Sequence, residues 1–78
     1  MNDLSSRLTT CFLSAFPDLR PSDVPQAAQA SLVQWDSVAH VILLSAVCEE
    51  FAVELDDEAF ESLTSYQQIL QFVENRVR

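Results

Sequence analysis

The chain has 78 residues, 49% of them apolar and none of them glycine, and its formal net charge is −8 from twelve acidic residues and four arginines. This length predicts one domain with a small core, and the lack of glycine for tight β-turns favours helices over strands. The negative charge argues against binding to nucleic acid or to an anionic membrane, because both carry negative phosphates. A protein partner with a basic surface is favoured instead.

The cysteines and the apolar segments indicate the cellular compartment in which the protein is expected. Cys11 and Cys48 lie inside apolar segments, and His40 is the only histidine, so we expect two buried, reduced thiols and no metal site. The first residues lack the basic start and the apolar stretch of a secretory signal. The longest apolar stretch, residues 38–48, is too short to cross a membrane. We therefore expect a cytoplasmic protein without membrane insertion.

The first predicted element is a helix over residues 3–16, where apolar side chains recur at helical spacing. Asn2 or Asp3 can cap its start, because either side chain can accept a hydrogen bond from the first N–H groups. Pro17 ends the helix. The stripe expected to face the core consists of Leu4, Leu8, Cys11, Phe12, Ala15 and Phe16.

A long connection follows over residues 17–35, which contain all three prolines. We expect a short helical turn within it, near residues 27–30. A connection of this length is uncommon in a compact domain and is often functional. Leu32, Val33 and Trp35 are expected to anchor it to the core.

The second helix is predicted over residues 37–51, with the Asp36 carboxylate as its N-cap. One apolar stripe is expected to face the core and consists of His40, Leu43, Leu44, Val47 and Phe51. A second stripe on the same helix consists of Val38, Val41, Ile42 and Ser45. A bundle this small cannot bury both stripes, so the second is predicted to face solvent as a docking surface.

A short third helix is predicted over residues 57–62. Its first N–H groups can be capped by a run of three acidic residues, Asp56, Asp57 and Glu58. Its apolar side chains, together with the residue that follows it, are Ala59, Phe60 and Leu63.

The fourth helix is predicted over residues 65–77, with Thr64 as N-cap and Gln67 at the third position of a capping box. Arg76 and Arg78 lie at its C-terminus, where the helix dipole favours cations. Its apolar face consists of Tyr66, Ile69, Leu70, Val73 and Val77. The pattern as a whole predicts an all-α fold, a four-helix bundle formed by a single domain over residues 1–78.

The candidate functional residue is Ser37, which lies in the first turn of the second helix. Backbone N–H groups point outward there, and the positive end of the helix dipole favours a phosphate. Because Asp36 already supplies the cap, the Ser37 hydroxyl is free for modification. The position therefore predicts an accessible serine that can carry a phosphodiester.

The residues around Ser37 resemble a known attachment motif. Asp36-Ser37-Val38 resembles the Asp-Ser-Leu motif of acyl and peptidyl carrier domains, and residues 35–40 are similar to a subgroup with Trp before the motif and His three residues after the serine. The resemblance continues through residues 49–55, Glu-Glu-Phe-Ala-Val-Glu-Leu, and through residues 63–65, Leu-Thr-Ser. It covers roughly residues 32–77 and implies the acyl carrier protein family, with an acyl-carrier-like bundle.

Three positions depart from the family pattern. Val38 replaces the usual Leu, Ala52 replaces the usual Gly, and Trp35 stands where a Gly usually precedes the motif. None of the three removes the serine. They bear on how the second helix ends and on which modifying enzyme and partners accept the protein.

The resemblance implies that a phosphopantetheinyl transferase, using magnesium, attaches the 4'-phosphopantetheine of coenzyme A to the Ser37 hydroxyl, with Asp36 helping to orient the complex. The arm would carry an acyl or aminoacyl group as a thioester in fatty-acid, polyketide or related secondary-metabolite synthesis. The expected partners are acyl-loading enzymes and acyl-transfer or condensing enzymes with basic surfaces. The protein is expected to be a monomer with no catalysis of its own.

The predicted partner surface combines apolar and acidic side chains. Seven acidic residues lie within residues 49–61, which is also the pattern of a merely solvated face. The residues expected to contact partners are Val38, Val41, Ile42, Glu49, Glu50, Glu54 and Asp57.

Two other functions are consistent with parts of the sequence. An acidic helical interaction module that is never modified would explain the charge, but it gives no reason for an exposed serine at this helix start. A Ser37–His40 pair one helical turn apart could suggest nucleophilic catalysis. No second histidine or evident oxyanion hole supports that mechanism, so His40 is expected at the edge of the core or in an interface.

Overall fold

The computed structural model describes residues 3–76, which form four α-helices and one 3₁₀ helix, η1. Within these residues there is no strand, and the only β-type pairing is a single bridge between Ala28 and Ser65. The predicted all-α fold is therefore confirmed. The elements are α1 (Asp3–Ala15), η1 (Pro21–Gln26), α2 (Ser37–Phe51), α3 (Asp57–Ser62) and α4 (Tyr66–Arg76).

The helix ends lie within a residue of the predicted ones. Helix α1 ends at Ala15 and α4 begins at Tyr66, one residue inside the expected bounds in each case. The expected cap by Asn2 and the roles of Val77 and Arg78 lie outside the described residues. No helix in residues 3–76 combines the length and the apolar character that crossing a membrane requires.

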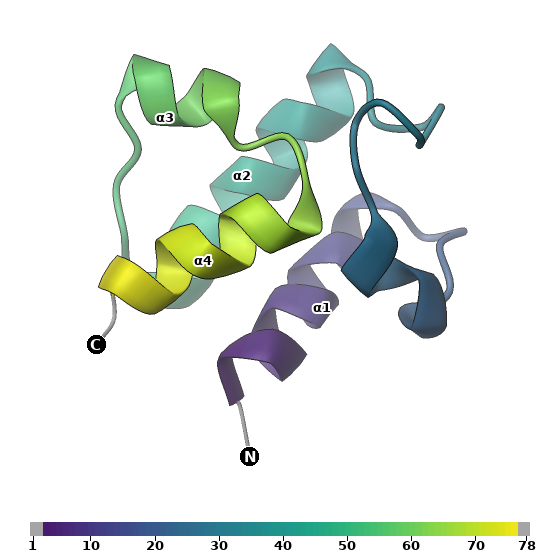
Figure 1. Ribbon diagram of the computed structural model, residues 1–78, viewed down its shortest axis with the longest axis horizontal. Coiled ribbons are helices and arrows are strands. Elements are labelled where there is room, and N and C mark those ends of the chain that lie inside the picture. Colours follow the sequence, from purple (N-terminus) through teal and green to yellow (C-terminus); the bar gives the residue numbers. More distant parts are fainter. Residues whose placement is uncertain (1–2, 77–78) are drawn as a thin grey trace.

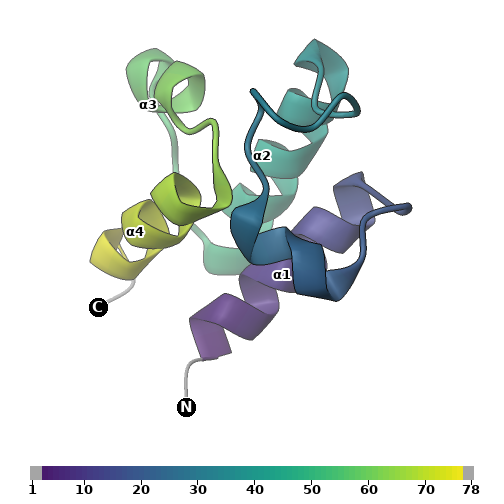
Figure 2. The same cartoon turned by 45° about the vertical axis from the view of Figure 1, so that its right-hand side comes forward.

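Helix α1 is the element around which the bundle is built. It packs against α2, η1 and α4, and η1 also packs against α4. In Figures 1 and 2, α3 lies at the upper edge of the molecule, away from α1. The connection from α1 to α2, dark blue to teal, runs along one side of the bundle (Figure 1).

The predicted stripes meet in one core. Phe12 is fully buried at its centre, with its ring centroid 5.6 Å from that of Trp35 and 5.4 Å from that of Tyr66. Aromatic rings at such distances pack edge to face and add to the gain from burial. The side chains with almost no exposed surface are Leu8, Phe12, Phe16, Val24, Leu43, Leu44, Val47, Ile69 and Val73.

The short helix in this connection is η1, which begins at Pro21. A proline at a first helical position has its φ angle preset and needs no N–H partner. Near the expected turn at residues 27–30, the N–H groups of Ser31 and Leu32 both donate to the Ala28 carbonyl, so a single hydrogen-bonded helical turn is present there. Residues 27–29 are also held by pairing with the start of α4, where the Tyr66 N–H donates to the Ala27 carbonyl and the Gln29 N–H donates to the Thr64 carbonyl.

The anchors of this connection also differ in part from the prediction. Trp35 is buried as expected and Leu32 is half-buried, but Val33 is 97% exposed, so its predicted contact with the core is wrong. Val24 and Ala27 are buried in its place. Leu32 and Trp35 turn inward on either side of Val33, and this leaves Val33 outside.

Two of the four predicted helix caps are confirmed. The Asp36 Oδ1 atom accepts from the Ala39 N–H at 2.9 Å, and the Asp56 Oδ1 atom accepts from the Ala59 N–H at 2.8 Å. These caps satisfy N–H groups that have no partner inside their own helix.

The predicted capping box of α4 is displaced by one residue. Ser65 is the cap, since its Oγ accepts from the Gln68 N–H at 3.2 Å, and the Gln68 Oε1 atom accepts from the Thr64 N–H at 3.0 Å. Thr64 and Ser65 are paired with the α1–α2 connection through the bridge to Ala28. That pairing keeps the chain extended for one residue longer than the local sequence predicts.

Helix α2 ends at Phe51, and its C-cap residue, Ala52, has a left-handed backbone with φ 55° and ψ 46°. Its N–H donates to the Cys48 carbonyl and so closes the last turn. The backbone thus takes the conformation that glycine favours, but with a Cβ atom present.

We expect Ala52→Gly to raise the free energy of unfolding by about 0.5–1 kcal/mol, because relief of the left-handed strain exceeds the added entropy of the unfolded chain. Urea denaturation followed by circular dichroism measures this change. Ala46→Gly inside α2 is the matched control and should lower the free energy of unfolding by about 1 kcal/mol. A change of the free energy of unfolding in the same direction for both substitutions would contradict the assignment of left-handed strain to Ala52.

Candidate functional site

Ser37 is the first residue of α2 and is exposed, as are Asp36 before it and Val38 after it. The Asp36 N–H donates to the Gln34 carbonyl at 2.9 Å, and the Asp36 carbonyl accepts from the His40 N–H at 2.8 Å. With the Ala39 N–H bound by the Asp36 side chain, the N–H groups of Ser37 and Val38 are the two in this first turn that have no hydrogen-bond partner within residues 3–76. An anion on the Ser37 oxygen can reach them.

The buried side chain of Trp35 fixes the position of the backbone two residues before Ser37. This side chain is 2% exposed, and its ring centroid lies 5.6 Å from those of Phe12 and Phe16, both on the α1 side of the core. A large aromatic ring buried in this way anchors the loop that leads into α2. Ser37 is therefore exposed on a fixed backbone and not on a free loop.

His40 lies one turn along α2 from Ser37 and is buried, with 7% of its surface exposed. The Trp35 indole N–H donates to Nδ1 of His40 at 2.9 Å, and Nε2 of His40 lies 2.7 Å from the Phe60 carbonyl oxygen. Because both ring nitrogens are occupied, neither is available to deprotonate Ser37. The geometry thus argues against activation of Ser37 as a nucleophile by His40. The sequence, which has no second histidine, argues against it as well.

The exposed apolar side chains gather near Ser37. Val38, Val41 and Ile42 are 67%, 49% and 50% exposed, so the second stripe of α2 faces solvent as predicted. The remaining large exposed apolar side chain of the described residues is that of Val33, in the loop just before the motif. The sequence analysis assigned Val33 to the core and therefore missed it as a member of this exposed surface.

The acidic residues divide into two kinds. Glu49, Glu54 and Asp57 are exposed. Glu50 is also exposed, but its Oε2 atom lies 2.7 Å from Nε of Arg7, and the Arg7 guanidinium also donates to the Glu50 carbonyl oxygen at 2.6 Å. Glu50 therefore links α2 to α1, a contact that no local pattern in the sequence predicts, and it is less free to meet a partner.

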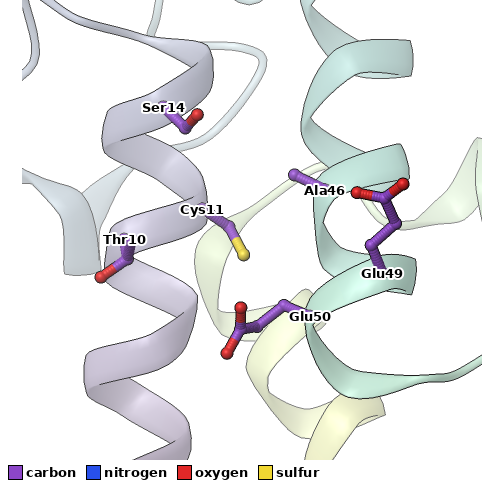
Figure 3. Close-up of a pocket in the computed structure, with 6 residues that line it drawn as sticks. All are labelled: Thr10, Cys11, Ser14, Ala46, Glu49 and Glu50. Carbon is purple, nitrogen blue, oxygen red and sulfur yellow. The ribbon is translucent and has the colours of Figure 1, made fainter.

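A hollow of about 380 Å³ lies between α1 and α2 (Figure 3), lined by Thr10, Cys11, Ser14, Ala46, Glu49 and Glu50. The Cys11 sulfur points into this gap (Figure 3). Burial, and then the Glu50 charge, raise the pKa of the Cys11 thiol to about 11, with Arg7 acting in the opposite direction. Cys11 is thus protonated at neutral pH and is a poor nucleophile.

Cys48 is half-buried, so the prediction of two buried thiols holds fully only for Cys11. Burial, followed by the charge of Glu54, raises the pKa of the Cys48 thiol as well. Both cysteines are free thiols. Cys48 lines a second hollow of about 310 Å³ beside α2, together with Leu44, Ser45, Glu49, Leu55 and Phe60.

Comparison with known proteins adds one finding. No family model matches the chain, and no solved structure matches it. The chain is 43% identical over 54 residues to the acyl carrier protein of Thermosynechococcus vestitus, and the aligned part covers 69% of this chain and 67% of that relative. Taken with the helical bundle, this similarity shows that the chain belongs to the acyl carrier protein family, whose members are carriers and not enzymes.

Proposed function

We propose that Ser37 is the residue to which 4'-phosphopantetheine is attached, so that the protein carries an acyl or aminoacyl group. Acyl carrier proteins in general bear this group. The observation that carries the proposal is the exposed Ser37 at the start of α2, where Asp36 supplies the cap and the first-turn N–H groups of Ser37 and Val38 have no hydrogen-bond partner within residues 3–76. These donors and the helix dipole fit a phosphodiester.

The attachment is a phosphoryl transfer in which this chain is the acceptor. The Ser37 hydroxyl oxygen forms a bond to the phosphorus at the pantetheine end of the coenzyme A pyrophosphate, and the bond from that phosphorus to the nucleotide half breaks. The hydroxyl proton leaves with a base of the transferase or with water. Asp36 is exposed beside Ser37, so its carboxylate can contact the transferase while it caps α2.

The attached group supplies a terminal thiol that holds the cargo as a thioester. Acyl-loading, acyl-transfer and condensing enzymes of fatty-acid, polyketide or related secondary-metabolite synthesis are the partners that fit this role. Free thiols suit a reducing cytoplasm, and a net charge of −8 opposes self-association, which favours a monomer. Binding to each partner should be weak and fast, because each must release the carrier.

We assign docking to the surface made by Val38, Val41, Ile42, Glu49, Glu54 and Asp57, with Glu50 contributing less because Arg7 holds it. Its apolar half starts directly after Ser37, and its acidic half continues from Glu49 towards α3. A basic surface on the partner complements the acidic half and sets the register of the complex.

The attachment is tested by incubating the purified protein with coenzyme A and a broad-specificity phosphopantetheinyl transferase and then measuring its intact mass. We expect a gain equal to one phosphopantetheinyl group. No gain with several transferases would favour the unmodified interaction module instead.

The docking surface is tested by Glu49→Lys, with the same transferase as partner. We expect KM for the carrier to rise roughly threefold to tenfold, because an attraction across the interface becomes a repulsion. The difference should shrink as salt is added. Asp18→Lys, an exposed position on the α1–α2 connection with the same change in charge, is the control. Equal effects of the two substitutions would indicate general attraction and not a docking surface.

A further inference from the structure

His40 joins three elements of the fold in a core that is otherwise apolar and aromatic. The Trp35 indole nitrogen can only donate, so Nδ1 of His40 must be the acceptor. The ring proton is then on Nε2, which donates to the Phe60 carbonyl oxygen. A buried polar group is costly without partners, so the two bonds stabilise one arrangement of the loop, α2 and α3.

Helix α3 depends on few contacts apart from His40. Its six residues include none that is fully buried, and α3 is absent from the more extensive helix–helix contacts in the described part of the chain. The ring of Phe60 packs edge-on against His40, with centroids 4.8 Å apart and planes at 80°. An element with so little buried surface moves more readily than the rest of the bundle.

Trp35, at the other end of the same network, lies two residues before Ser37. The Trp35 and His40 ring centroids are 6.1 Å apart, and the Trp35 ring packs against Phe12. Displacement of α3 would remove the acceptor of the Nε2 proton and would free the His40 ring to turn. A turned ring would withdraw Nδ1 from the Trp35 N–H, and the segment that leads into Ser37 would lose this contact.

We propose that His40 is a positioning residue that couples the seating of α3 to the presentation of Ser37. This inference rests on the proposed role of Ser37 as the attachment residue. A partner that contacts α3 through Asp57 thereby acts on the loop before Ser37, although the two contacts are on different elements. The transferase in turn accepts the serine best when α3 is seated.

The chain offers a selective probe, because Trp35 is its only tryptophan and yields a single indole N–H signal in a ¹H–¹⁵N spectrum. In the unmodified protein we expect Phe60→Ala to shift this signal and to speed amide exchange in residues 32–36. Leu55→Ala is the control, because Leu55 lines the same hollow as Phe60. An indole signal unmoved by Phe60→Ala, or moved equally by Leu55→Ala, would overturn the coupling.

The effect on Ser37 is measured with the transferase as a double-mutant cycle of Phe60→Ala and His40→Leu. Each single substitution should raise KM for the carrier about 2- to 10-fold with kcat little changed. The double variant should be no worse than His40→Leu alone, whereas additive effects would overturn the proposal.

If His40→Leu does not fold, Trp35→Phe replaces it in the cycle, since this substitution removes the indole donor together with part of the buried ring. His40→Gln is the conservative rescue. Partial recovery of KM in His40→Gln supports the role, and equal loss in all His40 variants contradicts it. The spectra and the exchange rates need no transferase. A protein that is never modified would therefore refute the attachment at Ser37 without affecting the measured coupling between α3 and Trp35.

Discussion

Replacing Ser37 with alanine is expected to abolish the gain in mass completely while leaving the fold intact. The hydroxyl is the only group on this side chain that can accept a phosphoryl group. It makes no hydrogen bond within residues 3–76, and Asp36 keeps the cap of α2. A substitution at such an exposed position changes the free energy of unfolding by no more than about 0.5 kcal/mol. Intact mass and urea denaturation measure the two halves of this prediction.

Ser45→Ala is the matched control, because Ser45 is also exposed on α2 but lies two turns further along, away from the first-turn N–H groups. It should leave the gain in mass unchanged. Asp36→Ala separates capping from attachment, since it should lower the free energy of unfolding by about 1 kcal/mol. A Ser37→Ala protein that still gains one phosphopantetheinyl group would show that the arm is attached elsewhere.

The sequence predicts this fold well wherever neighbouring residues decide the outcome. The core stripe of α2, from His40 to Phe51, and the caps by Asp36 and Asp56 depend on spacing within one helix, and the structure has all of them. The exposure of Ser37 follows from the same local pattern, because a helix start next to a good cap leaves the following side chain free.

The predictions were wrong where distant segments meet. Pairing of Ala28 with Ser65 moves the cap of α4 by one residue from its predicted position. The Arg7–Glu50 ion pair joins two helices at positions 43 residues apart in the chain. The spacing of apolar residues and the capping patterns describe one segment at a time, so they cannot predict contacts between distant segments.

In the candidate site, too, the local features are predictable from the sequence and the contacts between segments are not. Asp36, Ser37 and the apolar stripe after them are readable from the chain, whereas the network of Trp35, His40 and the Phe60 carbonyl is not. A tryptophan and a histidine five residues apart do not by themselves indicate that one ring will donate to the other. That contact requires the loop to fold back against the start of α2, and the packing of Trp35 on Phe12 places it there.

Phe12→Ala is expected to remove most of the stability of the domain. The side chain is fully buried and its ring contacts those of Phe16, Trp35 and Tyr66. Truncation of such a phenylalanine costs about 3–5 kcal/mol, whereas a domain of this size has roughly 4–12 kcal/mol in total. Thermal and urea unfolding, followed by the fluorescence of the single tryptophan, should show a large fall in the transition midpoint.

Phe72→Ala provides the matched control, because Phe72 is only half-buried and its ring lies 4.5 Å from the Arg76 guanidinium. It should cost about 1 kcal/mol. Phe12→Leu keeps most of the apolar volume, so it should fall between the two. Because Phe12 supports Trp35, we also expect Phe12→Ala to slow the modification of Ser37 at temperatures where Phe72→Ala does not. Equal destabilisation by Phe12→Ala and Phe72→Ala would contradict a core centred on Phe12.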